Sequence, residues 1–123
     1  MIITETKDSP YFLLDRKIGL ILLKGNSSLL LTKDFYEPLM NVLKMYVDTK
    51  PLYTKMIVDL DRFNTSSSKY ILEIFKILRQ LIKLNLKVEV DWYYTDVDDY
   101  MSEAGGDYSE IVKDLPFNLI MKK

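Results

Sequence analysis

Two alternating segments joined by an amphipathic stretch constrain the fold of this chain more than any other feature of its sequence. From Lys55 to Asp61 and from Leu86 to Tyr93, successive side chains alternate between a dry face and a wetter face, as they do in strands. A strand–helix–strand crossover makes its two strands parallel. We therefore predict an α/β fold in which helices cover mainly one face of the sheet. The intervening helix begins near Ser66 and has an apolar stripe made of Ile71, Ile74, Phe75, Leu78, Leu81 and Ile82.

The N-terminal part of the chain predicts a hairpin followed by a helix. Tyr11–Leu14 and Ile18–Leu23 are short apolar runs separated by three charged residues, which indicates two adjacent strands. We expect a turn at Gly25–Ser28. Apolar residues then recur at helical spacing from Asp34 to Tyr46, and Thr32 offers a side-chain oxygen as the cap of this helix.

The C-terminal part predicts one more helix and one more strand. Val97–Val112 has a weaker helical pattern that Gly105–Gly106 is expected to interrupt, and Pro116–Met121 has the composition of a closing strand. A length of 123 residues fits one compact domain. We therefore predict a single domain over residues 1–123, with a mixed sheet of four to five strands.

The composition narrows the classes of function. The chain has no cysteine and no histidine, which removes thiolate chemistry, the commonest metal ligand and the usual general base. A formal charge of -1 gives no sign of nucleic-acid binding. No apolar stretch reaches the roughly 20 residues that span a membrane, and the first ten residues are too polar for a secretory signal. We expect a cytoplasmic protein that needs no cofactor, binds no metal, and contacts neither nucleic acid nor membrane.

Four consecutive hydroxyl residues, Thr65 to Ser68, stand directly before the amphipathic helix. Thr65 or Ser66 would serve as its N-cap, a contribution of about 1 kcal/mol. One hydroxyl is enough for a cap, however, and a helix N-terminus also holds phosphate well. A phosphorylated Thr65 would add about two negative charges to this surface. Capping and phosphorylation both remain open as explanations of the run.

Aromatic and acidic residues follow the second alternating strand. Trp92 fits a core position, whereas Tyr93 and Tyr94 are candidates either for a protein interface or for plain surface packing. Asp96 is expected to cap the next helix, and the acidic set Asp96, Asp98 and Asp99 could also steer a basic partner.

Two short motifs suggest enzymes, but their contexts disagree with that interpretation. Asp59-Leu60-Asp61 after a strand has the carboxylate pair of haloacid-dehalogenase-like, magnesium-dependent phosphatases. Phe63 stands where that family expects threonine or valine, and the chain is short for its other motifs. Gly105-Gly106-Asp107 matches the start of a diguanylate cyclase signature, but the continuation is absent. We expect these glycines to allow a turn instead.

Several segments together resemble the SiaC-type family of regulatory phosphoproteins, over nearly the whole chain. They are Asn64-Thr65-Ser66-Ser67-Ser68-Lys69, Phe35-Tyr36-Glu37-Pro38-Leu39, Asp91-Trp92-Tyr93-Tyr94 and Leu115-Pro116-Phe117. That family is similar in fold to the anti-anti-sigma factors of the SpoIIAA type, which have STAS domains. The resemblance therefore implies a STAS-like fold and a non-catalytic signalling protein.

The resemblance also implies a partner-switching circuit. A serine/threonine protein kinase would phosphorylate Thr65, a metal-dependent protein phosphatase would remove the phosphate, and the unphosphorylated form would bind a target. In the best-understood branch of the family the target is a diguanylate cyclase, which links the circuit to c-di-GMP. An anti-anti-sigma role toward an anti-sigma kinase is the alternative. We expect the partner to contact Asn64, Ser66, Ser67, Ser68, Lys69, Tyr93 and Tyr94, and the sequence does not separate Thr65 from Ser66 as the acceptor.

Overall fold

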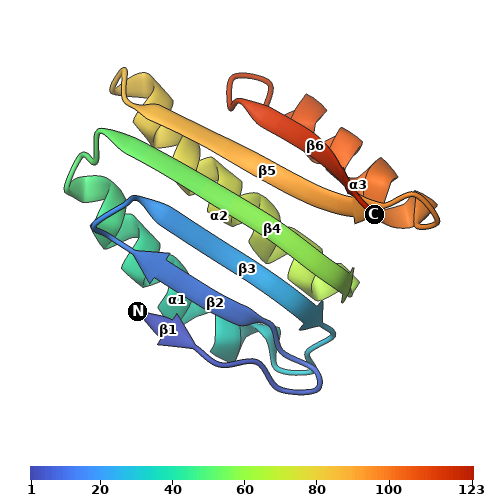
Figure 1. Cartoon of the computed structure of the whole chain (residues 1–123). Helices are drawn as coiled ribbons and strands as arrows, with labels where there is room; N and C mark the ends of the chain where they lie inside the picture. Colours follow the sequence, from blue (N-terminus) through green and yellow to red (C-terminus); the bar gives the residue numbers. More distant parts are fainter.

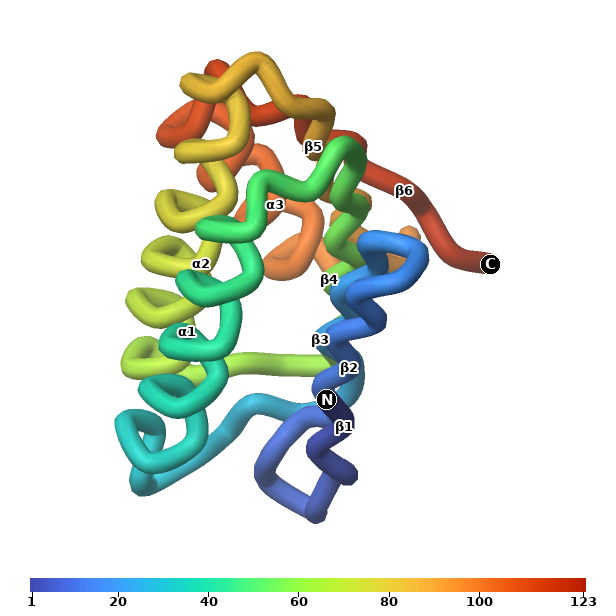
Figure 2. The backbone as a smooth tube through the Cα atoms, turned by 90° about the vertical axis from the view of Figure 1, so that its left-hand side faces the viewer, coloured from blue at the N-terminus to red at the C-terminus, as the bar shows by residue number.

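The computed structural model describes residues 1–123 as a single α/β domain with one six-stranded mixed sheet and three helices. The strands lie side by side in chain order, and all three helices pack on the same face of the sheet (Figures 1 and 2). The elements are β1 (Ile2–Ile3), β2 (Tyr11–Asp15), β3 (Leu20–Ser27), α1 (Thr32–Asp48), β4 (Tyr53–Phe63), α2 (Thr65–Lys83), β5 (Lys87–Thr95), α3 (Asp99–Ile111) and β6 (Phe117–Lys122).

The pairing of the strands confirms the predicted hairpin and the predicted crossover. β1, β2 and β3 pair antiparallel, whereas β3 to β6 pair parallel, and α2 connects the parallel strands β4 and β5. The sheet has six strands rather than four to five. The additional strand is β1, where Ile2 and Ile3 pair with Leu13 and Phe12. Two residues are too few for an alternating pattern to be recognised in the sequence.

The turn predicted at Gly25–Ser28 is wrong, because β3 continues through Ser27. Gly25 has a φ of +114°, a backbone conformation that favours glycine. The pairing with β4 shifts register at this point, since Gly25 pairs with Leu60 and Asn26 with Arg62. The glycine therefore allows an irregularity within the strand and does not end it.

Two predictions about helices are also wrong. Thr32 is the first residue of α1 rather than its cap, and Leu31 occupies the cap position without a side-chain hydrogen bond. Gly105 and Gly106 do not interrupt α3, which runs continuously from Asp99 to Ile111. A Cβ atom on Gly105 would lie 2.5 Å from Trp92 Cδ1 and 2.7 Å from Leu119 Cδ2. The glycine lets the helix backbone pack directly on the sheet.

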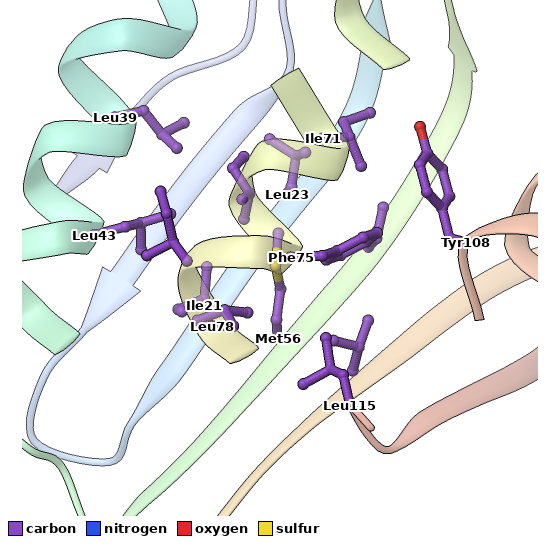
Figure 3. Close-up of a cluster of buried hydrophobic side chains, with 14 of the residues drawn as sticks. Ile21, Leu23, Leu39, Leu43, Met56, Ile71, Phe75, Leu78, Tyr108 and Leu115 are labelled. Carbon is purple, nitrogen blue, oxygen red and sulfur yellow. The ribbon is translucent and has the colours of Figure 1, made fainter. Parts of the chain in front are cut away.

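The core lies between the helices and the covered face of the sheet (Figure 3). Leu39 and Leu43 from α1 and Ile71 and Phe75 from α2 point toward the strands in Figure 3. Trp92 on β5 is fully buried, and its indole N–H donates a hydrogen bond of 2.9 Å to the Met101 backbone oxygen, which fixes α3 on the sheet.

The opposite face of the sheet has no covering helix and is held by ion pairs. Lys55 lies 3.0 Å from Asp91 and 3.4 Å from Glu89, Asn118 donates to Asp91, and Lys122 pairs with Asp59. This distribution confirms the predicted wetter face. None of the helices is both long enough and apolar enough to cross a membrane.

Candidate functional site

The start of α2 is held in place by Asn64, which connects the helix to the loop before α1. Its side-chain oxygen accepts a hydrogen bond of 2.9 Å from the Ser67 backbone N–H, and its amide nitrogen donates one of 2.8 Å to the Leu29 carbonyl. The N-cap is therefore Asn64, and the prediction of Thr65 or Ser66 is wrong. Phe63 still belongs to β4, so the residue after it has extended backbone, as an N-cap requires.

Thr65 and Ser66 occupy the first two helical positions and are exposed to solvent. The Ser67 backbone N–H donates to the Asn64 side chain, and the Ser68 backbone N–H donates to the Asn64 carbonyl. The N–H groups of Thr65 and Ser66 are thus the ones left at the open end of the helix, beside the two exposed hydroxyls. This is the arrangement that accommodates an anion at a helix N-terminus.

Ser67, by contrast, is completely buried. Its hydroxyl donates to the Ser27 carbonyl (2.9 Å) and accepts from the Ser27 hydroxyl (2.8 Å). Because the Ser27 proton is used in that bond, the Tyr36 hydroxyl, 2.6 Å from Ser27 Oγ, must be the donor to it. Burial raises the pKa of Tyr36 to about 12. The three hydroxyls form a buried chain that joins α1, β3 and α2, so the prediction of Ser67 as a partner contact is wrong.

Ser68 and Lys69 complete the segment. The Ser68 hydroxyl donates to the Thr65 backbone oxygen (2.6 Å), and the Ser68 backbone oxygen accepts from the Tyr108 hydroxyl of α3 (2.8 Å). Burial raises the pKa of Tyr108 well above its usual range. Lys69 is exposed. The first turn of α2 is therefore attached to β3, α1 and α3, while Thr65, Ser66 and Lys69 remain accessible.

Tyr93 and Tyr94 lie near the C-terminal end of β5, and both are half-buried. The parallel strand β4 also ends on this side of the sheet, just before α2 begins. Tyr94 packs against the core and lines a small depression together with Asp61 and Lys122. That depression includes no residue of α2. The structure thus brings Asn64, Ser66, Ser68 and Lys69 together with Thr65, whereas the depression that Tyr94 lines contains none of these residues.

The acidic residues singled out in the sequence have other surroundings. Asp98, not Asp96, caps α3, since its carboxylate accepts from the Met101 N–H at 3.0 Å. Asp59 is paired with Lys122, and Asp61 is exposed on the same strand. The chain contains no group of three or more histidine, cysteine or acidic side chains placed to hold a metal ion.

Comparison with known proteins gives a family and a fold. The family model described as SiaC family regulatory phosphoprotein matches residues 3–122. A chain in the crystal structure of diguanylate cyclase SiaD with its activator SiaC, from Pseudomonas aeruginosa, is 19% identical, with a TM-score of 0.91 and 99% of each chain covered. Apo-SiaC from the same organism is 19% identical, with a TM-score of 0.85, covering 100% of this chain and 98% of that one. No curated protein sequence matches the chain.

Proposed function

This chain belongs to the SiaC family of regulatory phosphoproteins, and we propose that it is a non-catalytic switch controlled by reversible phosphorylation of Thr65. The observation that carries the proposal is the exposure of Thr65 at the open end of α2, beside backbone N–H groups that have no helical partner. The family is one of phosphoproteins, and this part of the chain offers a kinase an accessible hydroxyl on an ordered support.

Burial and hydrogen bonding within the segment reduce the number of hydroxyl groups that could receive the phosphate. Ser67 is buried, and the hydroxyl of Ser68 is bonded to the Thr65 carbonyl. Thr65 and Ser66 remain, and the likeness of Asn64-Thr65-Ser66 to the family motif supports Thr65. Phosphate on Thr65 would add about two negative charges at the helix N-terminus, where the helix dipole favours an anion. The phosphate would change the charge of the surface offered to a partner, and this effect would not require a change of fold.

The partners that we propose rest on the resemblance to the family. Pseudomonas aeruginosa SiaC is the activator of diguanylate cyclase SiaD, and we propose a diguanylate cyclase as the target of this chain also. The unphosphorylated form would bind the target through the surface formed by Asn64, Ser66, Ser68 and Lys69. A serine/threonine protein kinase would add the phosphate, and a metal-dependent phosphatase would remove it. The dianion would weaken docking through its charge, its bulk and the cost of desolvating it.

Phosphopeptide mapping combined with co-purification tests this function. Protein isolated from its own cells should carry phosphate on Thr65. The Thr65→Ala variant should retain a diguanylate cyclase and alter its rate of c-di-GMP synthesis, whereas Thr65→Glu should retain much less of it. Thr4→Ala, which removes an exposed threonine outside α2, is the matched control and should behave as wild type. Equal retention of the cyclase by Thr65→Ala and Thr65→Glu, or phosphate found only elsewhere, would contradict the proposal.

A further inference from the structure

A second feature of the surface lies on the other side of the first turn of α2. A pocket of about 260 Å³ opens between the end of β4, the first turn of α2 and one face of α3. The residues around it are Phe63, Ser68, Tyr100, Glu103, Ala104, Asp107, Tyr108 and Ile111.

The walls of this pocket are fixed by packing in the folded chain. The ring of Phe63 lies 5.6 Å from that of Tyr100 and 6.1 Å from that of Trp92. Tyr108 is held by its hydrogen bond to the Ser68 carbonyl. Ala104 packs against the core and lines the pocket, and its small side chain occupies little of that space. Phe63 and Tyr108 are therefore held in place in the folded chain, and they form a fixed part of the pocket wall.

The size of the pocket indicates what it can hold. Small-molecule sites usually have volumes of about 300 to 1,000 Å³, so 260 Å³ is small for a cofactor but sufficient for one large side chain. The rim is apolar, since Tyr100 is 60% exposed and Ile111 is 54% exposed. Exposed aromatic and aliphatic side chains around a pocket are typical of protein interfaces.

The charge of the pocket indicates the sign of its occupant. Glu103 and Asp107 line it, both are exposed, and neither forms an ion pair within the chain. The segment from Asp96 to Glu110 contains six acidic residues and no lysine or arginine, although the whole chain has a formal charge of only -1. A cationic segment would complement this surface, and an anionic one would be repelled.

We propose that this pocket is a docking site for a partner protein segment in which one large apolar side chain is flanked by lysine or arginine. The apolar side chain fills the space over Ala104, and the cationic groups pair with Glu103 and Asp107. The pocket contains neither Thr65 nor Ser66, and it shares only Ser68 with the proposed target-binding surface. The proposal does not require Thr65 to be phosphorylated.

Site-specific photo-cross-linking in the cell tests this assignment. The full chain with benzoylphenylalanine at Tyr100 is irradiated, and the cross-linked segment is sequenced by mass spectrometry. The expected segment has lysine or arginine beside a large apolar residue. Glu103→Lys should reduce the cross-link yield about tenfold, whereas Glu110→Lys, the same charge change on α3 outside the pocket, should reduce it less than about twofold. Ala104→Trp, which fills the pocket, should also abolish the cross-link.

Several results would overturn the proposal. One is a cross-link yield at Tyr100 no higher than that of the same probe at Lys44, and another is an equal yield in Glu103→Lys and Glu110→Lys. The others are a cross-linked segment without basic residues and cross-links formed only between copies of this chain. Circular dichroism of each variant establishes that it is folded, and Ala104→Trp provides a second route to the same answer. The experiment is repeated in the Thr65→Ala background, so that a failure of the phosphorylation proposal is distinguished from a failure of this one.

Discussion

The buried hydroxyl chain makes a sharp prediction about two adjacent serines. Ser67 is fully buried and has two hydrogen bonds to Ser27, whereas Ser66 is exposed. Ser67→Ala removes both bonds, each worth about 1 kcal/mol net, and leaves the buried Ser27 carbonyl without this donor. Alanine recovers about 0.5 kcal/mol through its helix propensity. We therefore expect Ser67→Ala to lose about 2 kcal/mol of folding free energy.

Ser66→Ala is the matched control for this experiment. It has the same change in helix propensity but removes no buried hydrogen bond, so its stability should equal or slightly exceed that of wild type. Urea unfolding of both variants can be followed through the fluorescence of Trp92, the single tryptophan, which is buried in the core. A difference below about 0.5 kcal/mol between the two variants would refute the structural role given to Ser67.

Three further predictions concern the glycines of α3, the cap of α2 and the buried Tyr36. Gly105→Ala should destabilise the protein by about 1 to 3 kcal/mol, because its Cβ would clash with Trp92 and Leu119. Gly106→Ala, whose Cβ would contact no other residue, should stabilise the protein slightly. Thermal unfolding compares the two variants. Asn64→Asp keeps the capping acceptor but loses the donor to Leu29, so it should cost less in urea unfolding than Asn64→Ala, which loses both. Equal costs would mean that the capping bond from the Ser67 N–H contributes nothing. Folding raises the pKa of Tyr36 from 10.0 to about 12, so this side chain ionises at a lower pH in the unfolded chain than in the folded one. The folded state should therefore lose stability as the pH rises from 10 to 12. Urea unfolding at pH 9 and pH 11 should show a smaller loss of stability in Tyr36→Phe than in wild type.

The arrangement of the elements could be predicted because it depends on periodicity. The alternation in β4 and β5 and the apolar stripe of α2 are local patterns, and the crossover rule converts them into parallel strands. The helix start could likewise be located to within a residue or two. What the patterns did not resolve was which residue of Asn64-Thr65-Ser66 forms the cap, since all three side chains are competent caps.

The burial of Ser67 had a signal in the sequence that the interpretation of the hydroxyl run overlooked. Ser67 precedes Ile71 by four residues and Ile74 by seven, so it belongs to the buried stripe of α2. Its partner Ser27 could not be found in this way, because that pairing depends on β3 continuing past Gly25. The role of Gly105 was also hidden, since a glycine that permits close helix packing and one that ends a helix look the same in sequence.

The attachment of the first turn of α2 to three other elements bears on how fast such a switch can respond. Asn64, Ser67 and Ser68 connect that turn to the loop before α1, to β3 and to α3. A covalent group added at the neighbouring exposed position would therefore alter the electrostatic potential of a stationary surface, and no refolding step would separate modification from effect. In the proposed function, the time to change state would then depend on the turnover of the kinase and the phosphatase and on the exchange of the target, and not on refolding.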